Sequence, residues 1–552
     1  MNPLLSSISS NGDKGERTMQ VMDAPARSRR LRRGLAALAI VVPVAIGVGC
    51  GAAGTSSGAG PASTASFMPA GTPIYVEAST DLSSPQWAQA LTLAQRFPGY
   101  ADAARSFRRR LASAGLSFER DIAPLLGSHA AVGVSGLGKA GGDGNPDLTA
   151  AVEIAPGKEG DVIALAQRGK NGLTKAGTHA GVDYYSGGGA FLAVDDHTAV
   201  AANSRDGLFN SLDAHAAGGD RTLASSSKLK DAFSKLPDQV LAQAFVDVGA
   251  VVGDVQKNNT DAKSRLDSAG LADLGRNVTV AVSVAAEQDG VRVKGVIDGA
   301  KDLATADEFT PSLVKSAPAD AIAYVGLHNL ADTAGKLVAI LEKSNPDLKG
   351  QIDQVTGKLL PMLGVSLTDI KALFSLEHAI VVTSGSPVPS VTLALQVADG
   401  TQAKSTLDKL RERGSALAAM AGKGIPAFHK VELANGVSGW ESDVSKEAGI
   451  VYGVDGNLAL IGTSADGVRQ VQRATPSLAD SADFQAATRQ MPSKVTAVAW
   501  INIDRLVAAL RENGQLAKTD PKVIANLAPL KSIAAWGTGG ADPGFELFAT
   551  IK

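Results

Sequence analysis

The chain has 552 residues, a formal net charge of −2 and a single cysteine. One cysteine excludes an internal disulfide and every zinc site built on two or more cysteines. The near-neutral charge disfavours nucleic acid as the main partner, and an aromatic content of 4% disfavours the stacking platforms of proteins that bind single-stranded nucleic acid.

The first 49 residues have the pattern of an export signal. A cluster of arginines from Arg27 to Arg33 precedes the uncharged run GLAALAIVVPVAIGVG, residues 34–49, which is short for a membrane-spanning helix. Cys50 follows directly, and the segment resembles a bacterial lipoprotein signal. The resemblance implies that the Cys50 thiol carries a lipid and anchors the protein to the extracytoplasmic face of the cell membrane. An uncleaved, single-pass N-terminal anchor helix is the alternative. Residues 50–67, rich in Gly, Ala, Ser and Thr, are expected to form a flexible tether.

Periodicity and turn residues predict the elements that follow the tether. We expect helices at 83–97, 101–115, 159–169 and 204–215, and strands at 73–79, 129–135, 148–155 and in a meander over 182–203. A strand, a helical stretch and a hairpin complete the unit by residue 298. Because the strands come in runs joined by tight turns, we expect an α+β fold with largely antiparallel sheets.

The chain matches itself at nearly constant offsets. Tyr75 aligns with Tyr324 at an offset of 249, and 115–136 aligns with 364–385 at the same offset. Residues 194–207 align with 454–467 at an offset of 260. Colinear matches of this kind predict a tandem duplication. We therefore expect two related α+β repeats, residues 68–302 and 303–552, after the signal (1–49) and the tether (50–67).

Three segments resemble the bacterial domain family of unknown function called DUF3352. They are MPAGTPIYVEASTDL (from Met68), QWAQALTLAQRFPG (from Gln86) and GLSFERDIAPLLGSHAAVGV (from Gly115). The resemblance extends over essentially the whole exported chain. It implies an exported, often membrane-attached protein, and it provides no assigned activity and no catalytic residues.

Few residues carry a chemical signature. Seven histidines are present, and none forms H-x-H or H-E-x-x-H, so no metal site or cofactor is expected. His129 and His378 align between the repeats and are weak candidates for ligand contacts, although a structural role is the simpler interpretation. VDDHTAV around His197 is expected to be a hairpin turn, and Asp121 and Asp369 are expected to be helix N-caps.

The favoured hypothesis is therefore a membrane-tethered lipoprotein that binds or scaffolds without catalysis. Its partner would be a lipid, another apolar ligand or a protein of the cell envelope. The alternatives are an envelope hydrolase with its site between the two repeats, and an anchored structural protein.

Overall fold

The computed structural model describes residues 63–137, 146–168, 172–258, 277–299, 306–332, 335, 355–420, 427–444, 449–540 and 542–552. The predicted signal, Cys50 and the boundary predicted between residues 302 and 303 lie outside these ranges. Within them, no helix is both long enough and apolar enough to cross a membrane.

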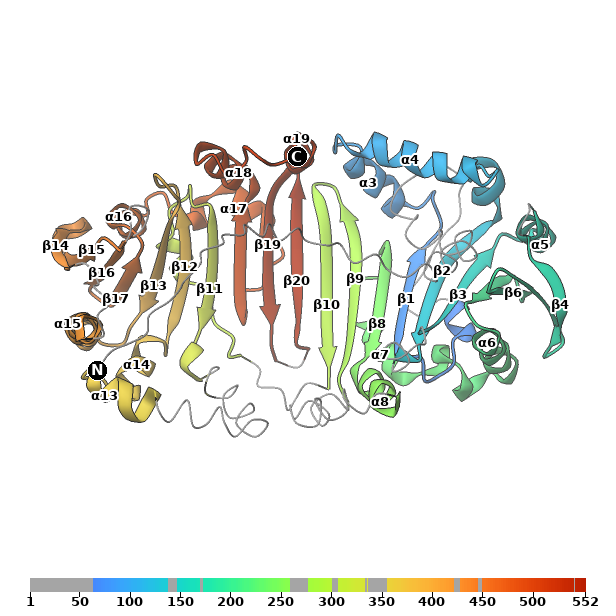
Figure 1. The fold of residues 1–552 in the computed structure, drawn as a ribbon, viewed down its shortest axis with the longest axis horizontal. Helices are drawn as coiled ribbons and strands as arrows, with labels where there is room; N and C mark the ends of the chain where they lie inside the picture. Colours follow the sequence, from blue (N-terminus) through green and yellow to red (C-terminus); the bar gives the residue numbers. More distant parts are fainter. Residues whose placement is uncertain are drawn as a thin grey trace, which may run out of the picture.

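One sheet of twenty strands forms the centre of the molecule (Figure 1). The first ten strands are β1 (Ile74–Ser79), β2 (Leu126–Ser135), β3 (Asp147–Ile154), β4 (Thr174–His179), β5 (Val182–Gly187), β6 (Ala190–Asp195), β7 (Thr198–Ala202), β8 (Ala242–Asp247), β9 (Thr279–Glu287) and β10 (Gly290–Asp298). The second ten are β11 (Ala323–His328), β12 (Glu377–Thr383), β13 (Ser390–Gln396), β14 (His429–Glu432), β15 (Ser438–Ser442), β16 (Ile450–Asp455), β17 (Leu458–Gly462), β18 (Ala497–Asn502), β19 (Leu530–Thr538) and β20 (Gly544–Ile551).

The two sets of strands form two halves of the sheet, and each half has the same strand order when it is read outward from the centre. From one edge inward the first half runs β4, β5, β6, β7, β3, β2, β1, β8, β9, β10. From the centre outward the second half runs β20, β19, β18, β11, β12, β13, β17, β16, β15, β14. Every pairing is antiparallel, which confirms the predicted α+β class. We use "first half" for β1–β10 with their helices and "second half" for β11–β20 with theirs.

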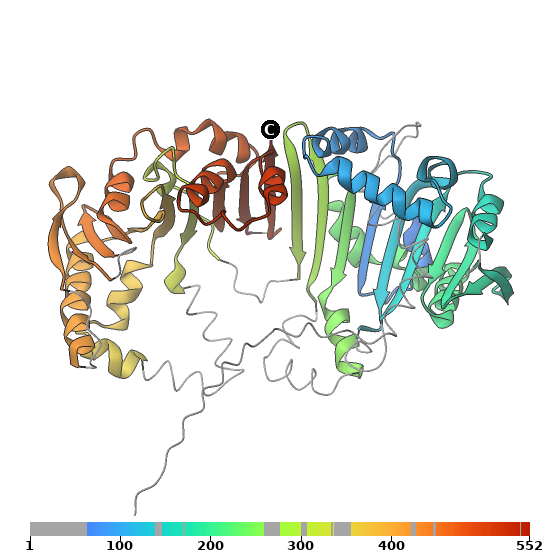
Figure 2. The ribbon, with the colours of Figure 1, turned by 45° about the horizontal axis from the view of Figure 1, so that its top comes forward.

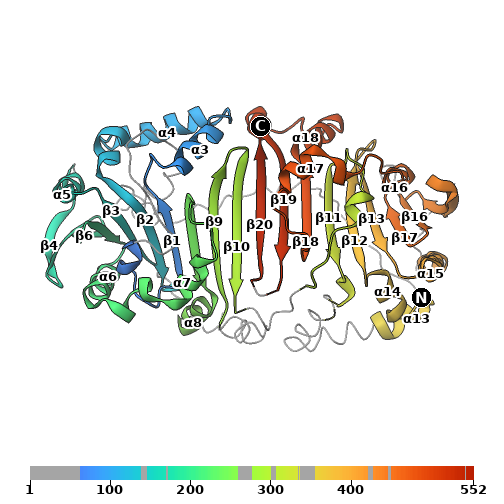
Figure 3. The same cartoon turned by 180° about the vertical axis from the view of Figure 1, so that it is seen from behind.

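The halves join where β10 pairs with β20. Each is the last strand of its half, and their antiparallel register places Gly290 opposite Thr550 and Val296 opposite Gly544. These two strands lie side by side at the centre of the molecule seen from behind in Figure 3. Figure 2 shows the consequence: the cyan-green strands of the first half and the orange strands of the second half lie at opposite ends of the molecule.

A half-turn about the centre of the sheet relates the strand order of one half to that of the other, and the helices are arranged in the same way. In Figure 1, α3 and α4 lie above the sheet's right half, whereas α13 and α14 lie below its left half. Among the described residues, the helices of the first half are α3 (Pro85–Ala94), α4 (Tyr100–Ser113), α5 (Glu159–Gln167), α6 (Arg205–Ala217), α7 (Ser227–Ser234) and α8 (Val248–Asn258). Those of the second half are α13 (Leu360–Met362), α14 (Leu367–Leu373), α15 (Gly400–Met420), α16 (Ala465–Gln472), α17 (Ala482–Ala487), α18 (Ile503–Glu512) and α19 (Pro521–Leu527).

The sheet buries side chains on both faces. Tyr75 and Tyr324 lie on one face, which we call the tyrosine face, because residues opposite each other in a pair share a face. The largest core of each half packs on this face, around Tyr75 with Phe245 and around Tyr324 with Trp500. We call the opposite face the pocket face. It packs against α3, α4 and α5 in the first half and against α14 and α15 in the second.

The start of the folded region differs from the predicted tether. Ser63–Phe67 forms a 3-10 turn, η1, and Thr64, Ala65 and Phe67 in it are buried against the tyrosine-face core of the first half. The prediction of a tether through residue 67 was therefore wrong for its last five residues. A high content of small residues predicted a flexible tether, but small residues also suit a turn that packs closely against a sheet.

The hairpin predicted around His197 is confirmed. Asp196 and His197 join β6 to β7 with φ angles of 41° and 57°. Positive φ at both central residues is the geometry that matches the twist of a two-residue hairpin. In the second half Gly456 occupies the corresponding turn with φ of 57°.

Arg292 stabilises the junction between the halves. The side chain is buried on the tyrosine face and donates to Glu287 and to Glu546 Oε2, the latter at 3.2 Å. Its guanidinium lies 4.5 Å from the ring centroid of Phe548 on β20. Arg489 of the second half also donates to Glu287, so one carboxylate of the first half holds two arginines.

Replacing Arg292 should weaken the whole molecule, because two largely buried carboxylates would lose a partner. We expect Arg292→Met to lower the free energy of unfolding by about 2–4 kcal/mol, measured by urea denaturation. Arg105→Met is the matched control, since Arg105 pairs with Asp102 on the exposed surface of α4; its loss should cost no more than about 0.5 kcal/mol. Equal effects of the two substitutions would contradict the role given to Arg292.

Candidate functional site

The two histidines that align in sequence do not occupy equivalent places. Ser79 lies opposite His129 in the first half. His328, at the position that corresponds to Ser79, lies opposite Glu377 and not opposite His378. The offset that relates the halves is 249 at Tyr75 and Tyr324 but 248 at Gly133 and Val381, the residues that pair with these tyrosines. The first half has its extra residue in the turn before β2, where Asp121 binds the backbone four residues earlier and Asp369 binds it three residues earlier. Because a shift of one residue turns a side chain to the other face, His129 lies on the tyrosine face and His378 on the pocket face.

His129 belongs to a polar cluster beneath η1. Glu153 on β3 accepts hydrogen bonds from the backbone N–H groups of Ser128 and His129, at 3.1 and 3.0 Å, and from the hydroxyl of Ser63. Its Oε2 also lies 3.4 Å from His129 Nδ1. Burial lowers the pKa of His129, but the hydrogen bond and the charge of Glu153 outweigh burial, so the net shift is upward. The arrangement fastens η1 to the sheet.

His378 lies in an apolar setting beneath α14. It is 3% exposed, its Nδ1 lies 3.3 Å from the carbonyl oxygen of Leu376, and its ring meets that of Phe374 edge-on at 6.1 Å. Burial lowers the pKa of His378. The imidazole is therefore neutral at pH 7. The prediction that His129 and His378 occupy equivalent places is therefore wrong.

Metal chemistry gains no candidate. Among the described residues, no group of three or more His, Cys, Asp or Glu side chains is close enough to hold a metal ion. The predicted N-caps also change identity: Ser117 and Ser366 are the capping residues, and Asp121 and Asp369 accept hydrogen bonds from the backbone N–H groups of those serines.

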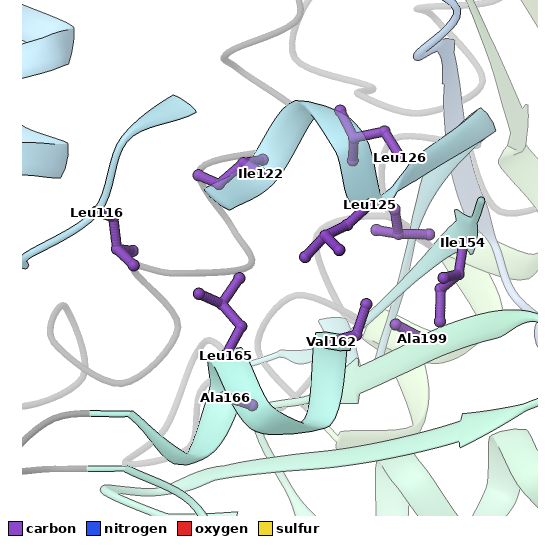
Figure 4. Close-up of a pocket in the computed structure, with 10 residues that line it drawn as sticks. Leu116, Ile122, Leu125, Leu126, Ile154, Val162, Leu165, Ala166 and Ala199 are labelled. Atoms are coloured by element: carbon purple, nitrogen blue, oxygen red, sulfur yellow. The ribbon is translucent and has the colours of Figure 1, made fainter. Parts of the chain in front are cut away.

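The first half has an apolar pocket between α5 and the sheet (Figure 4). Its cavity volume is about 90 Å³. Only aliphatic side chains line it, among them Ile122, Leu125, Val152, Ile154, Val162 and Leu165. In Figure 4 the side chains of Val162 and Leu165 on α5 and those of Ile122 and Leu125 on the opposite segment point into the space between them.

Local sequence explains both walls of this pocket. Helix α5 begins just after Gly157, whose φ of 75° lets the chain turn back over the sheet. Val162, Leu165 and Ala166 then follow at spacings of three and four residues, so they share one face of the helix. The opposite wall is the π-helical turn Phe118–Ile122 and the 3-10 turn Ala123–Leu125. Arg168 Nη1, just beyond α5, joins the two walls through a 3.2 Å hydrogen bond to Asp121.

The second half has a pocket beside the corresponding helix, although its other walls come from different strands. Helix α15 follows β13 as α5 follows β3, and the pocket lies between α15, β16 and β17. Its cavity volume is about 260 Å³. Leu407, Leu410, Phe428, Ile450 and Ile461 make most of the lining, and Arg411, Gly414, Ser415 and Tyr452 complete it.

Both pockets open on the pocket face, near opposite ends of the sheet. Val152 pairs with Ala130 and Ala199, whereas Leu393 pairs with Ile380 and Ile461. Sequence analysis missed these pockets because aliphatic residues at helical spacing are also what a filled core requires. Neither lining contains a serine, histidine or carboxylate in a catalytic arrangement, so the geometry suits binding of apolar matter.

Comparisons with known proteins give a family and little more. Residues 35–539 match the family described as "Protein of unknown function (DUF3352)". No curated protein matches. Solved structures of TP0453 in crystal forms III and I match with 8% and 10% identity, covering 43% of this chain and 80% and 79% of theirs, at TM-scores of 0.25 and 0.24. No inference about this chain follows from likenesses that weak.

The pKa values of the two histidines should be shifted in opposite directions. His129 should have a pKa above 6.5 and His378 a pKa below it, measured by NMR of ¹³C-histidine-labelled protein and assigned with His129→Gln and His378→Gln. Because the pKa of His129 is raised by folding, its contribution to stability is complete below the unfolded pKa and is lost as pH rises through the folded value. Glu153→Gln should remove the upward shift. Shifts of the same sign in both histidines would contradict these environments.

Proposed function

The chain belongs to the DUF3352 family, and we propose that it is a membrane-tethered binding protein without catalytic activity. Each half receives an apolar ligand, such as the acyl chain of a lipid, in the pocket beneath α5 or α15. The ligand would come from the cell envelope, where we place the protein.

One observation carries this proposal: an apolar cavity recurs beneath the corresponding helix of each half. Protein interiors are close-packed, so a cavity lined by aliphatic groups forgoes favourable contacts unless something fills it. An apolar cavity of about 150 Å³ can stay dry and bind benzene. The second-half pocket, at about 260 Å³, exceeds that size. The first-half pocket, at about 90 Å³, admits only the end of an acyl chain, and more of the chain would enter only if α5 moved outward.

Binding is favoured over hydrolysis by what surrounds the cavities. The first-half lining is wholly aliphatic, and His129 and Glu153 lie on the other face of the sheet. The junction between the halves, where a hydrolytic site was the alternative, is filled by paired strands and by Arg292. Ligand sites are typically concave and mostly apolar, with a few polar groups that orient the ligand.

The tether is proposed from the sequence. A lipidated Cys50 would hold the folded region near the membrane through the twelve residues 51–62, which precede η1. A single acyl anchor binds membranes weakly and two chains bind stably, and a diacylglyceryl group supplies two. The single-pass anchor helix remains the alternative form of the same attachment.

Filling the second-half pocket should abolish binding there without unfolding the protein. Gly414 lies within α15, and a Cβ added to it would meet only the tip of Leu363, at 3.9 Å. We expect Gly414→Phe to weaken binding of 1-octanol at least tenfold, measured by titration calorimetry. Gly414→Ala is the matched control: it should keep binding and stabilise the helix by about 0.5–1 kcal/mol. Unchanged octanol binding in Gly414→Phe would contradict this site.

The tether is tested by removing the thiol. Cys50→Ser should shift the protein from the membrane fraction to the soluble fraction, or leave a precursor that keeps its signal, when cells are fractionated. Labelled fatty acid should enter the wild type and not Cys50→Ser. Equal labelling of both would exclude lipidation at Cys50, and membrane retention without labelling would favour the anchor helix.

A further inference from the structure

The second-half pocket differs from the first in having one guanidinium in its lining. Arg411 on α15 stacks over Trp440 on β15, with its Cζ 3.8 Å from the ring. Its Nε donates to Tyr452 Oη at 2.8 Å, and its Nη2 donates to Glu412 Oε1 at 2.7 Å. Only 15% of the Arg411 side chain is exposed, so the guanidinium is held at the wall of the cavity and is not free in solvent.

The charge of Arg411 is not fully neutralised by the neighbouring carboxylate of Asp408. Tyr452 donates to Asp408 Oδ1 at 2.8 Å, and Lys404 donates to Asp408 Oδ2 at 2.6 Å. Burial raises the pKa of Tyr452, and its hydrogen bond to Asp408 raises it further, so the hydroxyl stays protonated. Burial raises the pKa of Asp408, but the bonds from Lys404 and Tyr452 outweigh it and keep the carboxyl ionised. Lys404 therefore balances Asp408.

The remaining hydrogen-bonding capacity of Arg411 lies at the two N–H groups of Nη1 and at the second N–H of Nη2. A guanidinium has five N–H donors, and the described residues accept hydrogen bonds from Nε and Nη2 only. Glu412, its one acidic partner, is 63% exposed and shares its charge with water. The pocket therefore has two kinds of surface. The fixed, planar guanidinium suits an anion, and the apolar lining of Leu407, Leu410, Phe428 and Ile461 suits a hydrocarbon chain.

We propose that the second-half pocket selects a single-chain anionic amphiphile, a fatty acid, whose carboxylate accepts hydrogen bonds from Arg411 Nη1. This inference rests on the proposed function and specifies its ligand class. The hydrocarbon chain lies along Leu407, Leu410 and Phe428, and a cavity of about 260 Å³ suits one chain. A carboxylate matches the planar fork of arginine and forms short, charge-assisted hydrogen bonds with it. The first-half pocket, with no charged group in its lining, has no such preference.

The test compares octanoate with 1-octanol, which share a chain and differ in charge. Using titration calorimetry on the full chain, we expect octanoate to bind the second-half pocket at least tenfold more tightly than octanol, since a charge-assisted hydrogen bond contributes about 1.5–3 kcal/mol. Arg411→Met keeps an unbranched side chain over Trp440, so it should remove that preference while octanol binds within about threefold of the wild type.

Two further variants keep the result interpretable. Lys409→Met removes the same charge from an exposed position of α15, and it should leave the octanoate preference unchanged. Arg411→Lys keeps a charge beside Asp408 and Glu412 and provides a variant if the methionine variant unfolds. It should weaken octanoate severalfold, because the fork is lost.

The outcomes distinguish the fatty-acid inference from the proposed apolar binding site on which it rests. Octanol binding without any preference for octanoate, or a preference that survives in Arg411→Met or falls equally in Lys409→Met, would overturn the fatty-acid inference and leave the apolar site intact. Failure of both compounds to bind the wild type would overturn the proposed function itself.

Discussion

The pairing of β10 with β20 is the constraint on which the rest of the structure depends. Each half alone would end on an open edge with a row of unpaired N–H and C=O groups. Pairing the two last strands buries both edges and converts two ten-stranded sheets into one. The half-turn that relates the strand orders also fixes the layers, because it keeps each face of the first half continuous with the same face of the second. Arg292 and Phe548 then cover the junction on the tyrosine face.

That symmetry places the pockets and also separates them. Helices α5 and α15 cover the same face of the sheet near its opposite ends, with both central strand sets between them. The pockets therefore cannot share one small ligand. Within this common plan the sequences differ: the first pocket is closed by aliphatic groups, whereas the second is larger and has a guanidinium at its wall. Two halves that share one strand order and have unlike pockets can bind two ligands, or two parts of one ligand, differently.

Much of the framework could be predicted from local signals. Alternation of apolar residues predicted β1, β2, β3 and the meander β5–β7, and the hairpin at Asp196 and His197 followed from turn chemistry. The exposed edge strand β4, of sequence TKAGTH, was missed because it has no apolar alternation. The pairing of β3 with β7 and of β10 with β20 could not be predicted, since these contacts join strands far apart in the chain.

The candidate site was less predictable than the fold, for a physical reason. Sequence alignment placed His129 on His378, yet one extra residue in the turn before β2 puts their side chains on opposite faces. The pockets left no signal, because a leucine that lines a cavity and a leucine that fills a core look alike in sequence. The most direct test of the account is native mass spectrometry of the full chain isolated from its own cell envelope. A bound species of lipid mass that is lost on denaturation is the result we predict, and a ligand-free mass under conditions that preserve the fold would contradict it.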